Sequence, residues 1–76
     1  MSKMIKINAP EDLIKALKKT RKSKKISQAE LGGFANITTA TISRIENEET
    51  DPQISTVLRL AKLLNLNIYI QDSQDE

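Results

Sequence analysis

The sequence predicts an all-α fold in which four short helices form a single domain over residues 1–76. Two observations lead to this prediction. Apolar residues recur every three or four positions through most of the chain, as they do on the buried side of a helix. Residue types that start or stop helices separate these periodic segments. A chain of this length buries only about 60–65% of its unfolded surface, so we expect a dimer to add stability.

The first helix is expected over residues 10–24. Pro10 suits the first turn of a helix, and the carboxylates of Glu11 and Asp12 interact favourably with its positive end. The residues expected on its buried face are Leu13, Ile14, Leu17 and Arg21.

Two shorter helices, joined by a tight turn, are expected to follow over residues 28–35 and 39–47. Ser27 can cap the first of them, and the Glu three residues later completes a capping box. Asn36 lies at the turn, where it tolerates a left-handed backbone, and Thr38 can cap the next helix. The apolar positions that would hold the pair together are Leu31, Ala35, Ile37, Ile42 and Ile45. This arrangement is a helix-turn-helix, whose second helix is shaped to enter the major groove of DNA.

The last helix is expected over residues 54–64, after an acidic loop that contains Pro52. Its apolar residues cover more than one face. The residues expected to close the core are Ile54, Val57, Leu58, Ala61 and Leu64. Leu60 and Leu63 are then expected to face a partner.

Two short strands are expected at the ends of the chain, over residues 4–7 and 66–71, where apolar and polar residues alternate. Such strands are not stable alone, so the C-terminal strand is expected to pair with its copy in a second subunit, optionally flanked by the N-terminal one. The alternative is a loosely attached tail. The residues expected in the homodimer interface are Leu60, Leu63, Leu66, Ile68, Tyr69 and Ile70. Residues 72–76 are expected to be a mobile tail.

The composition excludes several classes of protein. Without Cys or His, the chain has no disulfide, no thiolate or imidazole metal site, and no Cys or His catalysis. No base-oriented nucleophile, paired-carboxylate cleft or phosphate-cradling Gly loop is evident, so an enzyme is not expected and no cofactor is implied. No apolar run approaches a membrane span, and the N-terminus lacks the apolar core of a signal peptide. A cytoplasmic protein is therefore expected.

The charges of the chain are unevenly distributed. Residues 1–25 carry nine basic and two acidic side chains, a net charge of +7, whereas residues 26–76 carry a net charge of −5. Seven of the basic residues follow the first helix and its exit: Lys15, Lys18, Lys19, Arg21, Lys22, Lys24 and Lys25. Such a cluster either faces phosphates or is a solvated lysine surface. The neighbouring helix-turn-helix favours phosphates.

Three segments at fixed separations carry a resemblance to a known family: ISQAEL at 26–31, TISRIEN at 41–47 and LRLAKLL at 58–64. The chain resembles the Xre-type helix-turn-helix of phage repressors and bacterial antitoxins, which implies a lambda repressor-like fold. The N-terminal strand, the APEDL segment and the C-terminal LNIYI are similar to the HipB-type antitoxins. That likeness implies a small dimer that represses its own operon and holds a HipA-type serine/threonine kinase toxin.

The resemblance also implies which residues touch DNA. The groove-facing positions are Thr38, Thr39, Ala40, Ser43 and Arg44. The phosphate-contacting positions are Gln28 and Asn47, with longer-range attraction from Lys24 and Lys25. Arg44 could bond guanine in a bidentate contact or clamp a phosphate, and the sequence leaves both open. Glu46 is expected to pair with Arg21 as a structural ion pair. A dimer would place two recognition helices about 34 Å apart, so the expected target is an inverted repeat.

Some residues depart from the family pattern. Gly32 and Gly33 should each cost their helix about 1 kcal/mol relative to Ala, unless close packing at Gly32 compensates. Glu48 and Glu49 lie beside the expected DNA surface and would repel phosphates. Two alternatives to an autorepressor antitoxin therefore remain: a toxin-binding module with weak or no DNA binding, and a phage-type Cro or repressor regulator without a toxin.

Overall fold

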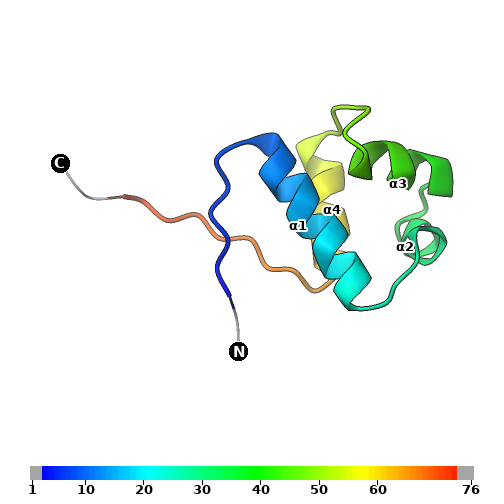
Figure 1. The fold of residues 1–76 in the computed structure, drawn as a ribbon, viewed down its shortest axis with the longest axis horizontal. Helices are drawn as coiled ribbons and strands as arrows, with labels where there is room; N and C mark the ends of the chain where they lie inside the picture. Colours follow the sequence, from blue (N-terminus) through cyan, green and yellow to red (C-terminus); the bar gives the residue numbers. More distant parts are fainter. Residues whose placement is uncertain (1–2, 74–76) are drawn as a thin grey trace.

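The computed structural model of this protein describes residues 3–73 and contains four helices. They are α1 (Pro10–Ser23), α2 (Gln28–Ala35), α3 (Thr39–Glu46) and α4 (Ile54–Leu63) (Figure 1). The predicted all-helical architecture is confirmed, and each helix ends within one residue of its predicted end. Within residues 3–73 no helix is long and apolar enough to cross a membrane.

Side-chain hydrogen bonds fix the starts of α1 and α2. The Asp12 carboxylate accepts hydrogen bonds from the backbone N–H groups of Asn8 at 2.9 Å and Ala9 at 3.1 Å, which fixes the start of α1. Ser27 Oγ accepts from the Glu30 N–H at 2.9 Å, and the Glu30 side chain accepts from the Ser27 N–H at 2.8 Å, so the capping box at α2 is complete.

All four helices end in the same way. Within two residues after each C-terminus lies a residue with a left-handed backbone, with φ between 58° and 61°, although none of these residues is glycine. They are Lys25, Asn36, Glu48 and Asn65. A backbone hydrogen bond closes each end, as between the Ile37 N–H and the Gly32 carbonyl at 2.8 Å. Asn36 therefore has the conformation that the sequence predicts at the turn.

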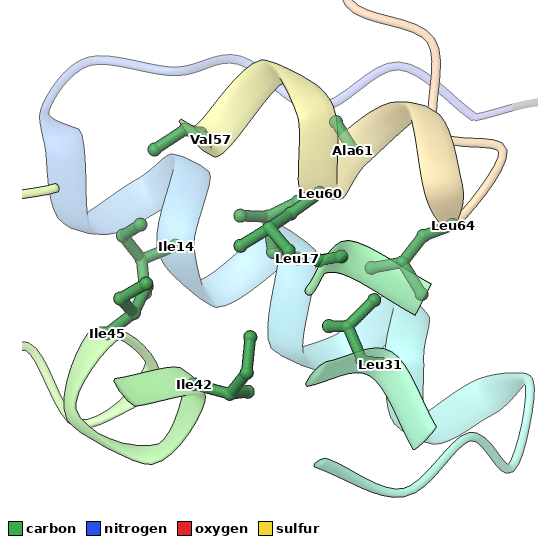
Figure 2. Packing of buried hydrophobic residues seen from close by; sticks show 10 residues of the cluster. Ile14, Leu17, Leu31, Ile42, Ile45, Val57, Leu60, Ala61 and Leu64 are labelled. Carbon is green, nitrogen blue, oxygen red and sulfur yellow. The ribbon is translucent and has the colours of Figure 1, made fainter. Parts of the chain in front are cut away.

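The core lies where the four helices meet, and Figure 2 shows its side chains pointing toward one another. Helix α2 packs against α3 and α4, and α1 packs against the same two helices. The buried apolar residues are Ile14, Leu17, Leu31, Ala35, Ile42, Ile45, Val57, Leu60, Ala61 and Leu64. The core therefore holds α2 and α3 at a fixed angle, which positions the surface of α3.

Helix α4 differs from its prediction. Leu60 is only 2% exposed and lies in the core, so its assignment to a dimer interface is wrong. Ile54 and Leu58, expected in the core, are 64% and 46% exposed. At 3.6 residues per turn, the buried stripe is turned by roughly 45° from the predicted one. The reason is that both stripes satisfy the helical period, and only the position of α1 and α2 selects between them. Leu63, at 40% exposure, remains on the surface as predicted.

The two glycines of α2 have different surroundings. A Cβ added to Gly32 would lie 2.5 Å from the Ile37 carbonyl oxygen, a distance at which the backbone would have to move. Nothing lies within 4 Å of a Cβ added to Gly33. Close packing thus explains the first glycine, and nothing in the structure explains the second.

The terminal segments carry neither helix nor strand within residues 3–73. The predicted strands 4–7 and 66–71 are therefore not formed by one chain, because a strand needs a neighbour to accept its backbone hydrogen bonds. In Figure 1 the C-terminal segment leaves the helices on the side away from α3. Residues 74–76 of the predicted tail lie outside the described residues.

Candidate nucleic-acid interface

Helix α3 has one buried face and one face open to solvent. Ile42, Ile45 and Glu46 point into the protein and fix the orientation of the helix. The sequence-predicted groove-facing residues lie on the outside: Thr38, Thr39, Ala40 and Arg44 are exposed, and Ser43 is half-buried. Because none of these side chains is large except Arg44, the backbone of α3 can approach a flat or concave partner closely.

Hydroxyl groups organise the start of this face. Thr38 Oγ1 accepts a hydrogen bond from the Thr41 N–H at 3.1 Å and donates to Thr41 Oγ1 at 2.9 Å. Arg44 Nη2 donates to the same Thr41 oxygen at 3.4 Å. The guanidinium therefore lies back along α3 toward its N-terminus. Sequence reasoning did not assign a role to Thr41, although its spacing of three from both Thr38 and Arg44 was a visible signal.

Beneath α3 lies the ion pair of Arg21 and Glu46. Arg21 Nε donates to Glu46 Oε2 at 2.7 Å, and Nη2 donates to Oε1 at 2.9 Å, so the contact is bidentate. Arg21 Nη1 also donates to the Ile26 carbonyl at 2.7 Å. Only 8% of the Arg21 side chain and 4% of the Glu46 side chain are exposed. This pair ties α1 to α3 and to the segment before α2.

Glu46 is charged despite its burial. Burial works against its carboxylate, but the hydrogen bonds from Arg21 and Gln28 and the charges of Arg21 and Lys18 outweigh it. As a result the pKa of Glu46 lies below its ordinary value. The ion pair therefore remains intact at neutral pH.

The predicted phosphate-contacting residues surround α3. Gln28, at the first turn of α2, is half-buried and donates from Nε2 to Glu46 Oε1 at 3.0 Å. Asn47, exposed at the end of α3, donates from Nδ2 to Ser43 Oγ at 3.4 Å. Lys24 and Lys25 are exposed in the loop before α2. The Gln28 amide is thus held by an internal bond that sequence reasoning did not foresee.

Acidic residues follow α3 directly. Glu48 and Glu49 are exposed, and Glu48 has the left-handed backbone that ends the helix. Apart from Leu60, the residues predicted for the dimer interface are accessible in one chain. Tyr69 and Ile70 are 81% and 98% exposed, Ile68 is 42% exposed, and Leu66 is half-buried.

Comparison with known proteins agrees with this geometry. A helix-turn-helix family profile matches residues 17–70. No curated protein sequence matches the chain. Among solved structures, a HipB variant in a complex with a 20mer called O2 superposes with a TM-score of 0.83 at 30% sequence identity, covering 95% of this chain and all of that one.

Two further structures are similar. HipB in a complex with a 20mer called O4 and a HipA–HipB–O2–O3 complex each superpose with a TM-score of 0.82 at 30% identity. Each match covers 93% of this chain and 100% of that chain. The profile spans well over half of the sequence and the HipB matches span nearly all of it, and the chain therefore belongs to the Xre-type helix-turn-helix family, among its HipB-like members.

Proposed function

We propose that this protein is a homodimeric DNA-binding autorepressor that also acts as the antitoxin of a HipA-type serine/threonine kinase toxin. The observation that carries the DNA-binding part is the open face of α3, fixed from behind by Ile42, Ile45 and the Arg21–Glu46 pair. The likeness to HipB in complexes with 20mers and with HipA supports both parts of the proposal.

Under this proposal, α3 enters the major groove and reads base edges. Ala40 and the methyl groups of Thr38 and Thr39 pack against thymine methyls, while the hydroxyls bond base edges or phosphates. Thr38 keeps its capping bond while its side chain remains exposed, so the two roles are compatible. Ser43 faces the groove one turn later.

Arg44 is the one long cationic side chain on α3. In the structure, this side chain lies along the helix surface and does not extend away from it. Its contact with Thr41 is long, at 3.4 Å, and is readily exchanged for a better acceptor. A bidentate contact with guanine would give about 1–3 kcal/mol of discrimination between bases. A phosphate contact would instead strengthen binding to all sequences about equally.

Phosphate contacts position the helix. Gln28 and Asn47 flank α3, and Lys24 and Lys25 add positive charge at the start of α2. Neutralising several phosphates per subunit releases counterions, so the affinity should fall steeply as salt increases. An affinity that does not change with salt would contradict this mechanism.

The proposed dimer forms through the C-terminal segment, in which Leu66, Ile68, Tyr69 and Ile70 pair with the second copy as a strand, together with Leu63 of α4. The exposure of the adjacent residues Tyr69 and Ile70 in one chain supports this, because contiguous exposed apolar surface is typical of an interaction site. The segment leaves on the side away from α3 (Figure 1), so pairing there keeps both recognition helices free for an inverted-repeat operator.

A gel shift with the DNA upstream of the gene tests the DNA-binding part. We expect Thr39→Ala and Arg44→Ala to weaken retardation of that DNA. Arg59→Ala is the matched control, because Arg59 is also an exposed arginine, on α4 and outside the proposed interface. If all three variants retard the operator like wild type, α3 is not the reading helix.

A second function is favoured by one specific observation, the two exposed carboxylates of Glu48 and Glu49 directly after α3. They would repel a phosphate backbone and suit a toxin-binding module that has lost DNA binding. Co-purification with a HipA-type kinase encoded beside this gene separates the possibilities. A complex without an operator shift supports the module, both together support the autorepressor antitoxin, and a shift without a complex supports a Cro-like regulator.

A further inference from the structure

A groove of about 470 Å³ opens on the surface between the start of α1, the loop from α3 to α4, and the start of α4. Its apolar lining includes Leu13, Pro52 and Ile54, and the acidic residues Glu11, Glu48 and Asp51 line it as well. Ile54 is 64% exposed. The groove therefore presents apolar surface beside a concentrated negative charge.

Among residues 3–73 the only ion pair is that of Arg21 and Glu46, so no Lys or Arg in this part of the chain forms an ion pair with the acidic residues of the groove. A ligand for the groove should therefore carry positive charge next to apolar side chains, in a segment narrow enough to lie between two helices.

Residues 3–7 of this same protein have that chemistry. Lys3 and Lys6 supply two positive charges, and Met4, Ile5 and Ile7 supply apolar side chains that are 86%, 50% and 43% exposed. Fully extended, five residues span about 17 Å, which is comparable with the length of a three-turn helix face. The groove and the segment carry opposite charges, and the apolar side chains of the segment remain exposed to solvent.

A chain does not fill its own groove. The bonds from the Asn8 and Ala9 N–H groups to Asp12 fix the direction in which the N-terminal segment leaves α1. The segment then lies over a different face of α1, beside Asp12, Lys15 and Lys19. The α1 residues that line the groove, Pro10, Glu11, Leu13 and Ile14, are not among the residues beside the segment. The occupant must come from another molecule.

We propose that residues 3–7 of a second copy occupy this groove, with Lys3 and Lys6 facing Glu11, Glu48 and Asp51, and the aliphatic side chains covering Ile54. Twofold symmetry makes the exchange reciprocal, so each dimer fills two grooves. The inference rests on the dimer of the proposed function and adds a second contact to it. It also neutralises Glu48, which lies beside the DNA-reading surface.

Cysteine cross-linking tests the exchange, because the natural chain contains no cysteine. Ile5→Cys is placed in one full-length chain and Ile54→Cys in a second chain that carries a longer tag. After mixing and mild oxidation we expect a disulfide-linked heterodimer, which requires the two Cα atoms to approach within about 7 Å. The matched control pairs Ile5→Cys with Lys62→Cys, an exposed site about 12 Å further along α4. The control should give several-fold less product, and equal yields would overturn the proposal.

Charge reversal tests the chemistry of the contact. Adding Lys6→Glu to the Ile5→Cys chain should lower the heterodimer yield several-fold, and adding Asp51→Lys to the Ile54→Cys chain should restore it. If neither change alters the yield of heterodimer, the proposal is overturned. Sedimentation equilibrium of the wild type separates the two failures: a monomer overturns the dimer itself, whereas a dimer without the specific cross-link overturns only the exchange.

Discussion

Removal of the Glu46 carboxylate is expected to be one of the most damaging single changes outside the apolar core. Glu46 accepts three hydrogen bonds, from Arg21 Nε at 2.7 Å, Arg21 Nη2 at 2.9 Å and Gln28 Nε2 at 3.0 Å. Glu46→Ala removes all three at once. Arg21 then keeps a single bond, from Nη1 to the Ile26 carbonyl, while its charge stays buried.

The size of the effect follows from that stranded charge. Breaking one side of a buried ion pair costs about 3–5 kcal/mol of unfolding free energy, because the remaining ion is neither solvated nor paired. The bond from Arg21 to Ile26 survives, so we expect the lower end, about 3 kcal/mol. For a domain of this length each kcal/mol lowers Tm by about 4–8 °C, which gives a fall of about 12–24 °C.

Urea denaturation followed by far-UV circular dichroism measures this loss. Glu49→Ala is the matched control, since Glu49 is exposed and should change the unfolding free energy by less than about 0.5 kcal/mol. The double variant Arg21→Met/Glu46→Leu should be more stable than Glu46→Ala, because it leaves no unpaired charge. A loss below about 1 kcal/mol in Glu46→Ala, or a double variant less stable than the single one, would refute the reasoning.

Four further outcomes are expected from the same structure. Gly32→Ala should lower the unfolding free energy by about 1–2 kcal/mol, since its Cβ would meet a backbone carbonyl at 2.5 Å, whereas Gly33→Ala should raise it by about 1 kcal/mol; thermal melts that rank the two alike would disprove this. The pKa of Glu46 is lowered on folding, so below about pH 4.3 the unfolded state binds more protons than the folded state. The wild type should therefore lose unfolding free energy as the pH falls through this range, and Glu46→Gln should lose less. Leu60→Ala should lower the unfolding free energy by about 3 kcal/mol in urea titrations, as a core residue does and a surface residue does not. Glu48→Gly should raise Tm by a few degrees, because it relieves a left-handed backbone worth about 1 kcal/mol.

Most of the helical architecture could be predicted because single residues determine where its helices begin and end. Ser27 with Glu30, Asn36 and Thr38 each make the local bond or adopt the backbone conformation that their chemistry suggests. The exposed side of α3 follows in turn, since Ile42 and Ile45 leave only one orientation for the helix. These features depend on neighbours in sequence, which is why no tertiary information was needed.

Features that depend on tertiary packing could not be predicted in the same way. Helix α4 offers two overlapping apolar stripes, and the choice that buries Leu60 and exposes Ile54 is made by α1 and α2. The hydrogen bond from Gln28 to Glu46 joins residues that are 18 positions apart, and no local sequence pattern predicts it. The alternating pattern of 66–71 predicts a strand, but a strand needs a neighbouring strand for its backbone hydrogen bonds, and residues 3–73 of one chain do not provide one.

The distribution of glycine shows how packing overrides local preference in this fold. Glycine is the residue best suited to a left-handed helix end, yet the four such ends carry Lys25, Asn36, Glu48 and Asn65, and both glycines lie inside α2. At Gly32 the choice is forced, because the Ile37 carbonyl oxygen lies only 2.5 Å from the position that a Cβ would take. The same contact sets the distance from α2 to the start of α3, and hence the position of Thr38 and the surface it begins. Gly32 thus lowers the stability of α2 but fixes the position of α3, the helix proposed to read DNA. A larger residue at Gly32 should therefore disturb operator binding even where the protein still folds.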